Sequence, residues 1–185
     1  MELKQVILGR RAVREYTDQA VDDRMILHIV RDAVQAPSAV NQQPWLFTVV
    51  RDQAILNTIL KKSKAHMLVT MSPDGSDDHF KGHLESADFQ IFYHAPALIV
   101  ISAAQQDRWH TEDCALAAEN LMLSAFVAGL GSCWIGFAQG YLSTHECKSL
   151  LGIADGAMPV APIIVGYARH DPPAVARKEP VIHWL

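Results

Sequence analysis

Ala97-Leu98-Ile99-Val100-Ile101 is an uninterrupted apolar stretch that follows Pro96. A strand with one face in water alternates apolar and polar side chains, whereas a strand covered on both faces is apolar throughout. The stretch therefore predicts the central strand of a sheet. Segments 46–50 and 160–168 are also predicted to be strands.

Short helices are predicted around these strands, over residues 3–8, 23–34, 84–94 and 144–151. Their ends carry typical signals. Gly9 and Gly152 stand where a left-handed residue closes a helix, and Asp22 or Asp23 can cap the second helix. Ser143-Thr144-His145-Glu146 matches a capping box. Pro96 is expected to stop the helix over 84–94.

Residues 113–128 form the longest helical pattern, with apolar side chains around nearly the whole circumference. Such a helix must be enclosed on most sides. A small domain rarely does this alone, so we expect this helix in a dimer interface. The apolar terminus, residues 181–185, should also dock on a surface, because a free tail would expose Trp184.

Composition limits the classes of protein that the chain can belong to. Its 185 residues fit a single domain over 1–185, and its 50% apolar content allows a full core. The net charge of -4 disfavours nucleic acid as a partner. No apolar segment approaches the ~20 residues that cross a membrane. Three scattered cysteines and no secretory signal favour a cytoplasmic location.

Two polar features have weaker functional signals. Residues 63–81 are polar and turn-rich, which predicts a loop that could act as a mobile lid. His79, His83 and Glu85 could face one way, but they lack the spacing of a known zinc motif, and we expect no metal.

Arg10, Arg11 and Arg14 place three cations within five positions of an acidic chain. Cations after a helix complement its dipole, which is one explanation. The other is a phosphate site, because guanidinium groups match phosphate oxygens in two-pronged contacts. Arg177 and Lys178 could close such a site from the other end of the chain. Composition alone favours the first explanation.

Four segments in order resemble the FMN-dependent nitroreductase family. Residues 10–16, Arg-Arg-Ala-Val-Arg-Glu-Tyr, are similar to its arginine-rich opening, and residues 37–45, Pro-Ser-Ala-Val-Asn-Gln-Gln-Pro-Trp, to its second motif. Residues 120–136, from Asn-Leu-Met-Leu to Gly-Leu-Gly-Ser-Cys-Trp-Ile-Gly, and the pair Arg177-Lys178 match the other two. The resemblance thus extends from residue 10 to 178.

The resemblance implies an α+β fold, a three-layer α/β/α sandwich with a mixed, largely antiparallel sheet. It also implies an entwined homodimer with FMN at the subunit interface. The implied activity is hydride transfer from NAD(P)H, through flavin N5, to a small oxidised substrate such as a nitroaromatic or quinone. Gly129-x-Gly131 lacks the third glycine of a dinucleotide motif, since Trp134 stands there, so both substrates would use one cavity in turn, by a ping-pong mechanism.

The family motifs imply specific roles for residues of this chain. Arg10, Arg11, Ala12 and Arg14 would hold the phosphate, ribityl chain and pyrimidine edge, and Arg14 would stabilise the reduced flavin. Arg177 and Lys178 would complete the phosphate site. The flavin would be approached from the partner chain by Pro37, Ser38, Ala39 and Asn41. Trp134, Ile135 and Gly136 would lie along the flavin ring. Ordinary packing in a strand is the alternative explanation for the tryptophan and the glycine.

This chain departs from the family pattern at Ala12 and Ala39, which replace hydroxyl residues, and at Ile135, which replaces an acidic residue of some members. The reaction is therefore open. Alternatives are reductive dehalogenation, ene reduction or flavin fragmentation on the same scaffold, or a noncatalytic module for flavin storage or dimerisation. Aromatic residues that could line a pocket, or lie in the core, are Tyr16, Trp45, Phe80, Phe92 and Phe137.

Overall fold

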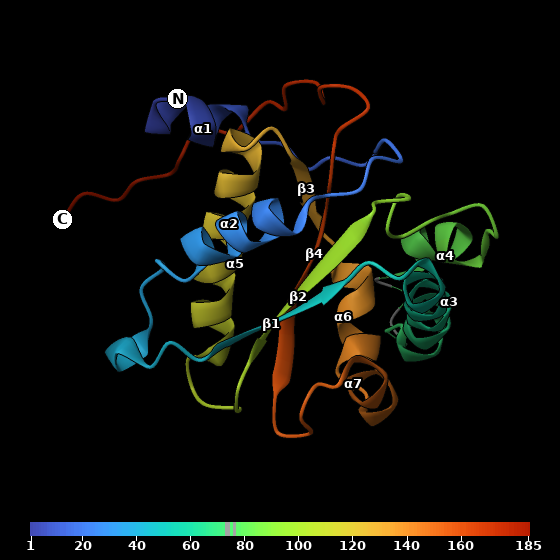
Figure 1. Cartoon of the computed structure of the whole chain (residues 1–185). Helices are drawn as coiled ribbons and strands as arrows, with labels where there is room; N and C mark the ends of the chain where they lie inside the picture. Colours follow the sequence, from blue (N-terminus) through green and yellow to red (C-terminus); the bar gives the residue numbers. More distant parts are fainter. Residues whose placement is uncertain (73–74, 76) are drawn as a thin grey trace.

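A four-stranded sheet lies between two layers of helices (Figure 1). The computed structural model describes residues 1–72, 75 and 77–185. The strands have the order β1-β2-β4-β3, and each neighbouring pair is antiparallel. Their bounds are β1 (Trp45–Val50), β2 (Ala97–Ala103), β3 (Gly131–Trp134) and β4 (Met158–Gly166). The only parallel pairing in the described part is an isolated bridge between Ala12 and Ser132.

The apolar stretch 97–101 lies in β2, an interior strand of the sheet, as its composition predicts. Every residue of β2 is buried. Alternate side chains enter different cores, Ile99 and Ile101 on one face and Leu98 and Val100 on the other. This alternation between two cores is what a strand covered on both faces requires.

Each core is closed by its own helices. On one face lie α2 (Asp23–Ala33) and α5 (His110–Val127), and α1 (Leu3–Gly9) packs on the end of α5. On the other lie α3 (Gln53–Thr70), α6 (Gly136–Leu142) and α7 (His145–Leu151), with α4 (Asp78–Glu85) against α3. The predicted α+β class with three layers is confirmed.

Two sequence predictions about the middle of the chain are wrong. The predicted loop over 63–81 is helical as far as Thr70, because Ser63 is buried and Lys64 donates to the carbonyls of Ser86 and Phe89. These contacts between distant segments outweigh the polar composition. Pro73, Asp74 and Ser76, which carry much of the turn signal, lie outside the described residues.

The second error concerns the predicted helix over 84–94. Helix α4 ends at Glu85, and the following segment makes separate four-residue turns, in which the amides of Phe89, Tyr93 and Ala95 donate to the carbonyls of Ser86, Gln90 and Phe92. Helical φ and ψ are not possible where Tyr93 and His94 adopt φ of 50° and 58°.

The two glycines predicted to close helices do so in different ways. Gly152 has φ 65° and ends α7, as expected. Gly9 is instead the last residue of α1, and its lack of a side chain serves packing, since a Cβ there would lie 2.6 Å from Cζ of Phe126 on α5. The predicted capping box does not form, because the N-cap of α7 is Thr144, not Ser143, and its hydroxyl accepts from the Cys147 amide.

Several apolar surfaces remain exposed. On α5, Leu116 and Val127 are exposed although the rest of the helix is largely buried. Beyond Arg169 the chain runs without regular structure, and Trp184 is 88% exposed. No helix in the described ranges is both long and apolar enough to cross a membrane.

Candidate functional site

The arginine segment lies beside β3 and is pinned to it. The Val13 amide donates to the Ser132 carbonyl at 3.0 Å, next to the Ala12–Ser132 bridge. Gly131 permits this approach, because a Cβ there would lie 2.6 to 2.9 Å from three atoms of the Val13 side chain. The buried Tyr16 hydroxyl donates to the Val13 carbonyl at 2.9 Å. The arginines are therefore carried on a fixed backbone.

Arg10 and Arg11 line a cavity of about 320 Å³ at the start of β3, together with Gly131 and Ser132. Arg10 pairs with Glu119 of α5 at 3.4 Å. Arg11 donates from Nη1 to the Leu8 carbonyl at 2.6 Å, which is the helix-end role that composition favours. Its Nε is buried and lacks a partner among the described residues.

A second cavity, of about 300 Å³, opens where β3 ends. It unites Arg14 with the predicted ring-contacting residues 134–136 and has a largely apolar lining completed by Met67, Phe80, Tyr93, Cys133 and Phe137. Gly136 borders it, and a Cβ at that position would meet nothing within 4 Å. No packing within the chain thus requires a glycine at this point. We call this space the ring cavity.

Aromatic side chains in edge-to-face contact form one wall of the ring cavity. Phe137 lies 5.3 Å from Phe80 and 6.0 Å from Phe89, between ring centroids. Phe89 in turn lies 6.1 Å from Tyr93, and the Arg14 guanidinium carbon is 5.9 Å from the Tyr93 ring centre. Such a wall favours a flat, apolar ligand.

Two ionisable groups near the arginines are held neutral. Burial raises the pKa of the Cys133 thiol, although the charges of Arg14 and Arg10 lower it. Burial likewise raises the pKa of Tyr16. The Cys133 thiol therefore lacks the thiolate character of a nucleophile.

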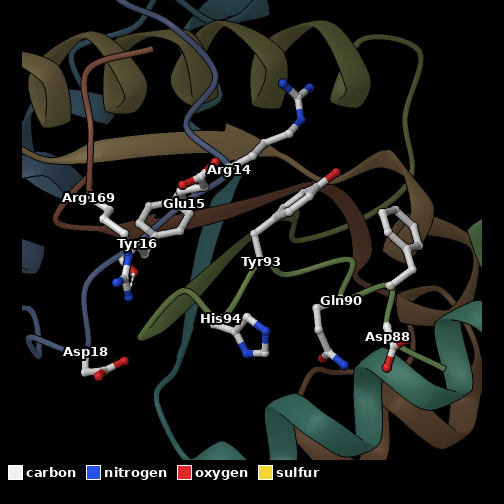
Figure 2. Close-up of a pocket in the computed structure, with 10 residues that line it drawn as sticks. Arg14, Glu15, Tyr16, Asp18, Asp88, Gln90, Tyr93, His94 and Arg169 are labelled. Carbon is white, nitrogen blue, oxygen red and sulfur yellow. Dashed lines mark hydrogen bonds between the residues drawn. The ribbon is translucent and has the colours of Figure 1, made fainter. Parts of the chain in front are cut away.

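A third, polar cavity of about 400 Å³ lies beside Tyr93 (Figure 2). It shares Arg14 and Tyr93 with the ring cavity. Its remaining lining is Glu15, Tyr16, Asp18, Asp88, Phe89, Gln90, His94 and Arg169. We call it the polar groove.

The predicted loop over 37–41 lies far from the arginines of the same chain. Its Ala39 amide donates to Asp113 at the start of α5, whereas Gly9 contacts Phe126 near the end of that helix. Phe126 follows Asp113 by 13 residues, about 20 Å of helix at 1.5 Å per residue. The loop, which contains the 3₁₀ turn η1 (Ala39–Asn41), and α1 lie at opposite ends of α5 (Figure 1).

Asp113, at the start of α5, anchors this loop and the start of β1 by two hydrogen bonds. Its Oδ1 accepts from the Ala39 amide at 2.9 Å, and its carbonyl accepts from Trp45 Nε1 at 2.9 Å. Left-handed φ occurs in the loop at Val40 (44°) and Asn41 (57°), and just beyond it at Gln43 (51°). Its backbone shape thus depends on contacts that offset the strain of such residues.

The structure brings together only part of the predicted site. Arg10, Arg11, Ala12, Arg14 and residues 134–136 follow one line along β3. Pro37, Ser38, Ala39 and Asn41 lie elsewhere. Arg177 and Lys178 are exposed in the tail, whose contribution to the arginine cavity is Asp171 and Pro172.

Sequence reasoning missed some residues of the ring cavity. Phe80 and Phe137 were candidates and line it, whereas Trp45 and Phe92 belong to the core. Met67 and Tyr93 had no sequence signal. Among the described residues, no group of three or more His, Cys, Asp or Glu side chains is arranged to hold a metal.

The chain is similar to known proteins over most of its length. The family model described as "Nitroreductase family" matches residues 7–167. A provisionally named NADH dehydrogenase/NAD(P)H nitroreductase from Archaeoglobus fulgidus is 31% identical over 176 residues, covering 92% of this chain and 87% of that protein. An iodotyrosine deiodinase from Haliscomenobacter hydrossis is 30% identical over 143 residues, 70% of this chain and 64% of that protein.

A solved structure shows the same fold. It is a nitroreductase with bound FMN from Bacteroides fragilis, with a TM-score of 0.80 and 26% identity, and the match covers 99% of this chain and 95% of that one. Together with the sequence match over 7–167, this similarity shows that the chain belongs to the nitroreductase family of flavoprotein oxidoreductases.

Proposed function

We propose that this protein binds FMN and passes hydride from NAD(P)H to a small oxidised substrate, a nitroaromatic, a quinone or a related electrophile. One observation carries the proposal. Along the four residues of β3, a cavity bordered by two arginines is followed by an apolar cavity bordered by a third. This order matches a molecule with an anionic end and a flat ring end.

The arginine cavity fits the phosphate of FMN. Arg10 and Arg11 are adjacent, and the buried Arg11 Nε lacks a partner among the described residues. A buried donor without an acceptor is costly, so an anion that accepts from it would be stabilising. Ala12 offers no hydroxyl, and only its backbone could contribute. Arg177 and Lys178 lie in the exposed tail and would contact the phosphate only if the tail folded back over the arginine cavity.

The ring cavity fits the flavin ring. Its apolar wall and the open space at Gly136 suit a flat ring that approaches the backbone of Trp134, Ile135 and Gly136. When bound, FMN supplies a carrier that accepts a hydride from one substrate and delivers it to another. Arg14 places a permanent positive charge at this cavity, where it would stabilise negative charge. Phe80, Phe137 and Tyr93 would exclude water.

We further propose that the working form is a homodimer in which residues 37–41 complete the partner's site. Within one chain they lie about 20 Å of helix away from the arginines. The exposed Leu116 and Val127 on α5, and the exposed tail residues Val181, Ile182 and Trp184, give each chain apolar surface that a second copy would cover.

Reductive dehalogenation is a second candidate reaction on the same site. The relative from Haliscomenobacter hydrossis, named iodotyrosine deiodinase, is 30% identical over 70% of this chain. A halogenated phenol would use the same hydride donor and the same cavity. Turnover of nitroaromatics and of halophenols by the purified protein separates the two reactions.

The test begins with the purified, FMN-loaded protein under anaerobic conditions. We expect NAD(P)H to bleach the flavin absorbance near 450 nm, on the order of one hydride per flavin, and a nitroaromatic to restore it. A yellow colour that NAD(P)H leaves unchanged would instead indicate flavin storage.

Replacing Arg10→Ala together with Arg11→Ala tests the phosphate site. We expect a folded protein with FMN affinity lowered by about 100-fold or more, since each charge-assisted contact contributes about 1.5 to 3 kcal/mol. Lys61→Ala with Lys62→Ala is the matched control, because it removes two adjacent cations from the exposed surface of α3. Equal affinity in both double variants would reject the phosphate site.

A further inference from the structure

The polar groove has no role in the arrangement proposed so far. Its polar side chains surround His94, with Asp18 and Arg169 on one side and Gln90 and Asp88 on the other (Figure 2). Its volume of about 400 Å³ exceeds that of the ring cavity. The two cavities share Tyr93 and Arg14 in their linings, so the groove lies directly beside the ring cavity.

The groove carries an excess of negative charge. Its carboxylates are Glu15, Asp18 and Asp88, and its guanidinium groups are Arg14 and Arg169. Glu15 is near His170, at 3.9 Å, whereas no ion pair joins Asp18 or Asp88 to another described residue. Arg14 directs its guanidinium away from both of these aspartates (Figure 2). The groove therefore holds one inward-facing guanidinium, that of Arg169, which lies on the same side of His94 as Asp18, while Asp88 lies on the other side.

The junction between the cavities is conformationally fixed. Tyr93 and His94 both have left-handed φ, 50° and 58°, which is uncommon for bulky residues. Arg169 donates to the Tyr16 carbonyl at 3.3 Å, which ties the opposite wall to the arginine segment. Strained pairs of this kind persist where the surrounding structure holds them, often beside binding sites.

We propose that the polar groove binds the ribose and phosphate portion of the nicotinamide dinucleotide, and that its carboxylates make NADH the preferred donor over NADPH. This inference rests on the proposed function, in which the nicotinamide ring enters the ring cavity. Arg169 supplies a cation for the pyrophosphate. Asp18 and Asp88 supply acceptors for ribose hydroxyls, which is how acidic residues recognise an unphosphorylated ribose.

The same carboxylates oppose NADPH. Its 2′-phosphate adds close to two negative charges, and the groove has no second inward-facing guanidinium to receive them. Repulsion between a carboxylate and a phosphate is modest in a solvated groove. We therefore expect NADH to exceed NADPH by about tenfold in kcat/KM, with each aspartate contributing roughly threefold.

The experiment compares wild type with Asp18→Asn and Asp88→Asn. Each substitution should reduce the NADH-to-NADPH ratio of kcat/KM by about threefold, and the two together by about tenfold. Asp155→Asn is the matched control, because it removes an exposed carboxylate beside α7. Arg169→Gln should weaken both donors alike.

A binding measurement separates this inference from the proposed function. ADP-ribose and 2′-phospho-ADP-ribose are titrated by calorimetry, which needs no electron transfer. We expect ADP-ribose to bind more tightly and the two aspartate variants to narrow the difference. If neither NADH nor NADPH reduces the bound flavin, while ADP-ribose still binds more tightly than 2′-phospho-ADP-ribose, the proposed function is rejected and the groove assignment stands. NADH turnover with no such preference, or with a ratio that Asp18→Asn and Asp88→Asn leave unchanged, would overturn the groove assignment.

Discussion

Two segments that the family motifs assign to one cofactor lie at opposite ends of α5. The arginine segment, 10–14, runs beside β3 near Phe126, and the loop 37–41 rests on Asp113. About 20 Å of helix separates their contacts on α5. This separation supports the proposal above that the two segments serve one cofactor from different chains of a dimer.

The two segments are also held differently. The arginine segment is fixed by the Val13 backbone bond to β3 and by the Tyr16 hydroxyl, both buried against the core. The loop is anchored to α5 by Asp113 and is otherwise held by local hydrogen bonds, in which the Gln43 amide donates to Ser38 Oγ and Gln43 Nε2 donates to Asn41 Oδ1. Its residues Val40 and Asn41 have left-handed φ. We therefore expect changes near Gly131 to affect the fold and changes near Asp113 to affect chiefly the loop.

Mixed dimers give the largest expected effect. One chain carries Arg10→Ala with Arg11→Ala, and the other carries Ser38→Ala with Asn41→Ala. If the segments serve sites in different chains, one site of the mixed dimer receives both defects and the other receives none. We expect each homodimer to bind little FMN and the mixed dimer to bind one FMN, about half the wild-type content, measured by flavin absorbance after copurification with two tags.

A mixed dimer with no flavin would contradict the proposal that the two segments serve a site from different chains, because every site would then contain one defect. That outcome would place the arginines and the loop in the same site of a single chain. Coexpressed wild-type chains with the same two tags provide the reference for full FMN content.

Gly131→Ala tests the rigid segment. The new Cβ would lie 2.6 Å from Val13 Cγ2, and the Val13 backbone is bonded to β3, so relief requires movement of the arginine segment. We expect a loss of about 2 to 3 kcal/mol in the free energy of unfolding, measured in urea, and weaker FMN binding. Gly156→Ala, with nothing within 4 Å, is the control. Adding Val13→Ala removes both Cγ atoms and leaves Cβ at 2.8 Å, so it should restore part of the loss. Equal losses with and without it would show that the Cγ contacts do not cause the destabilisation.

Patterns within a segment predicted much of the fold. The uniform apolar run of β2 identified an interior strand, and the apolar circumference of α5 indicated that one chain leaves part of it uncovered. Contacts between distant segments were not predictable in this way. Lys64 is polar, yet its bonds to Ser86 and Phe89 anchor a helix where composition indicated a loop.

The site shows the same division. The arginines and residues 134–136 were found by motif and meet along β3, because a short spacing fixes their side of the sheet. Tyr93 and Met67 reach the ring cavity through a strained turn and the far end of α3, which no local pattern encodes. Asp113 acts across 74 residues, and only the fold reveals its bond to Ala39.

Asp113→Ala tests whether the loop 37–41 depends on its contact with α5. It removes the acceptor for the Ala39 amide, which we expect to cost about 1 to 2 kcal/mol in stability. Part of this is offset, because the unpaired Oδ2 of a buried carboxylate is also removed. Asp113→Asn keeps an acceptor and should retain most of the FMN affinity that Asp113→Ala loses. Equal FMN affinity in both variants and wild type would show that the loop does not need this bond.

Gly136→Ala has the smallest expected effect on the fold, and for that reason it isolates the ligand. The change is the same as at Gly131, but here the methyl group would meet no described atom within 4 Å beyond the adjoining residues and the backbone of α6. Alanine favours the first turn of α6, so the free energy of unfolding in urea should stay within about 0.5 kcal/mol of wild type. The methyl group would instead enter the ring cavity, and FMN affinity should fall while stability without FMN does not. Unchanged affinity would mean that the flavin ring does not approach this backbone, even if Gly131→Ala behaves as expected.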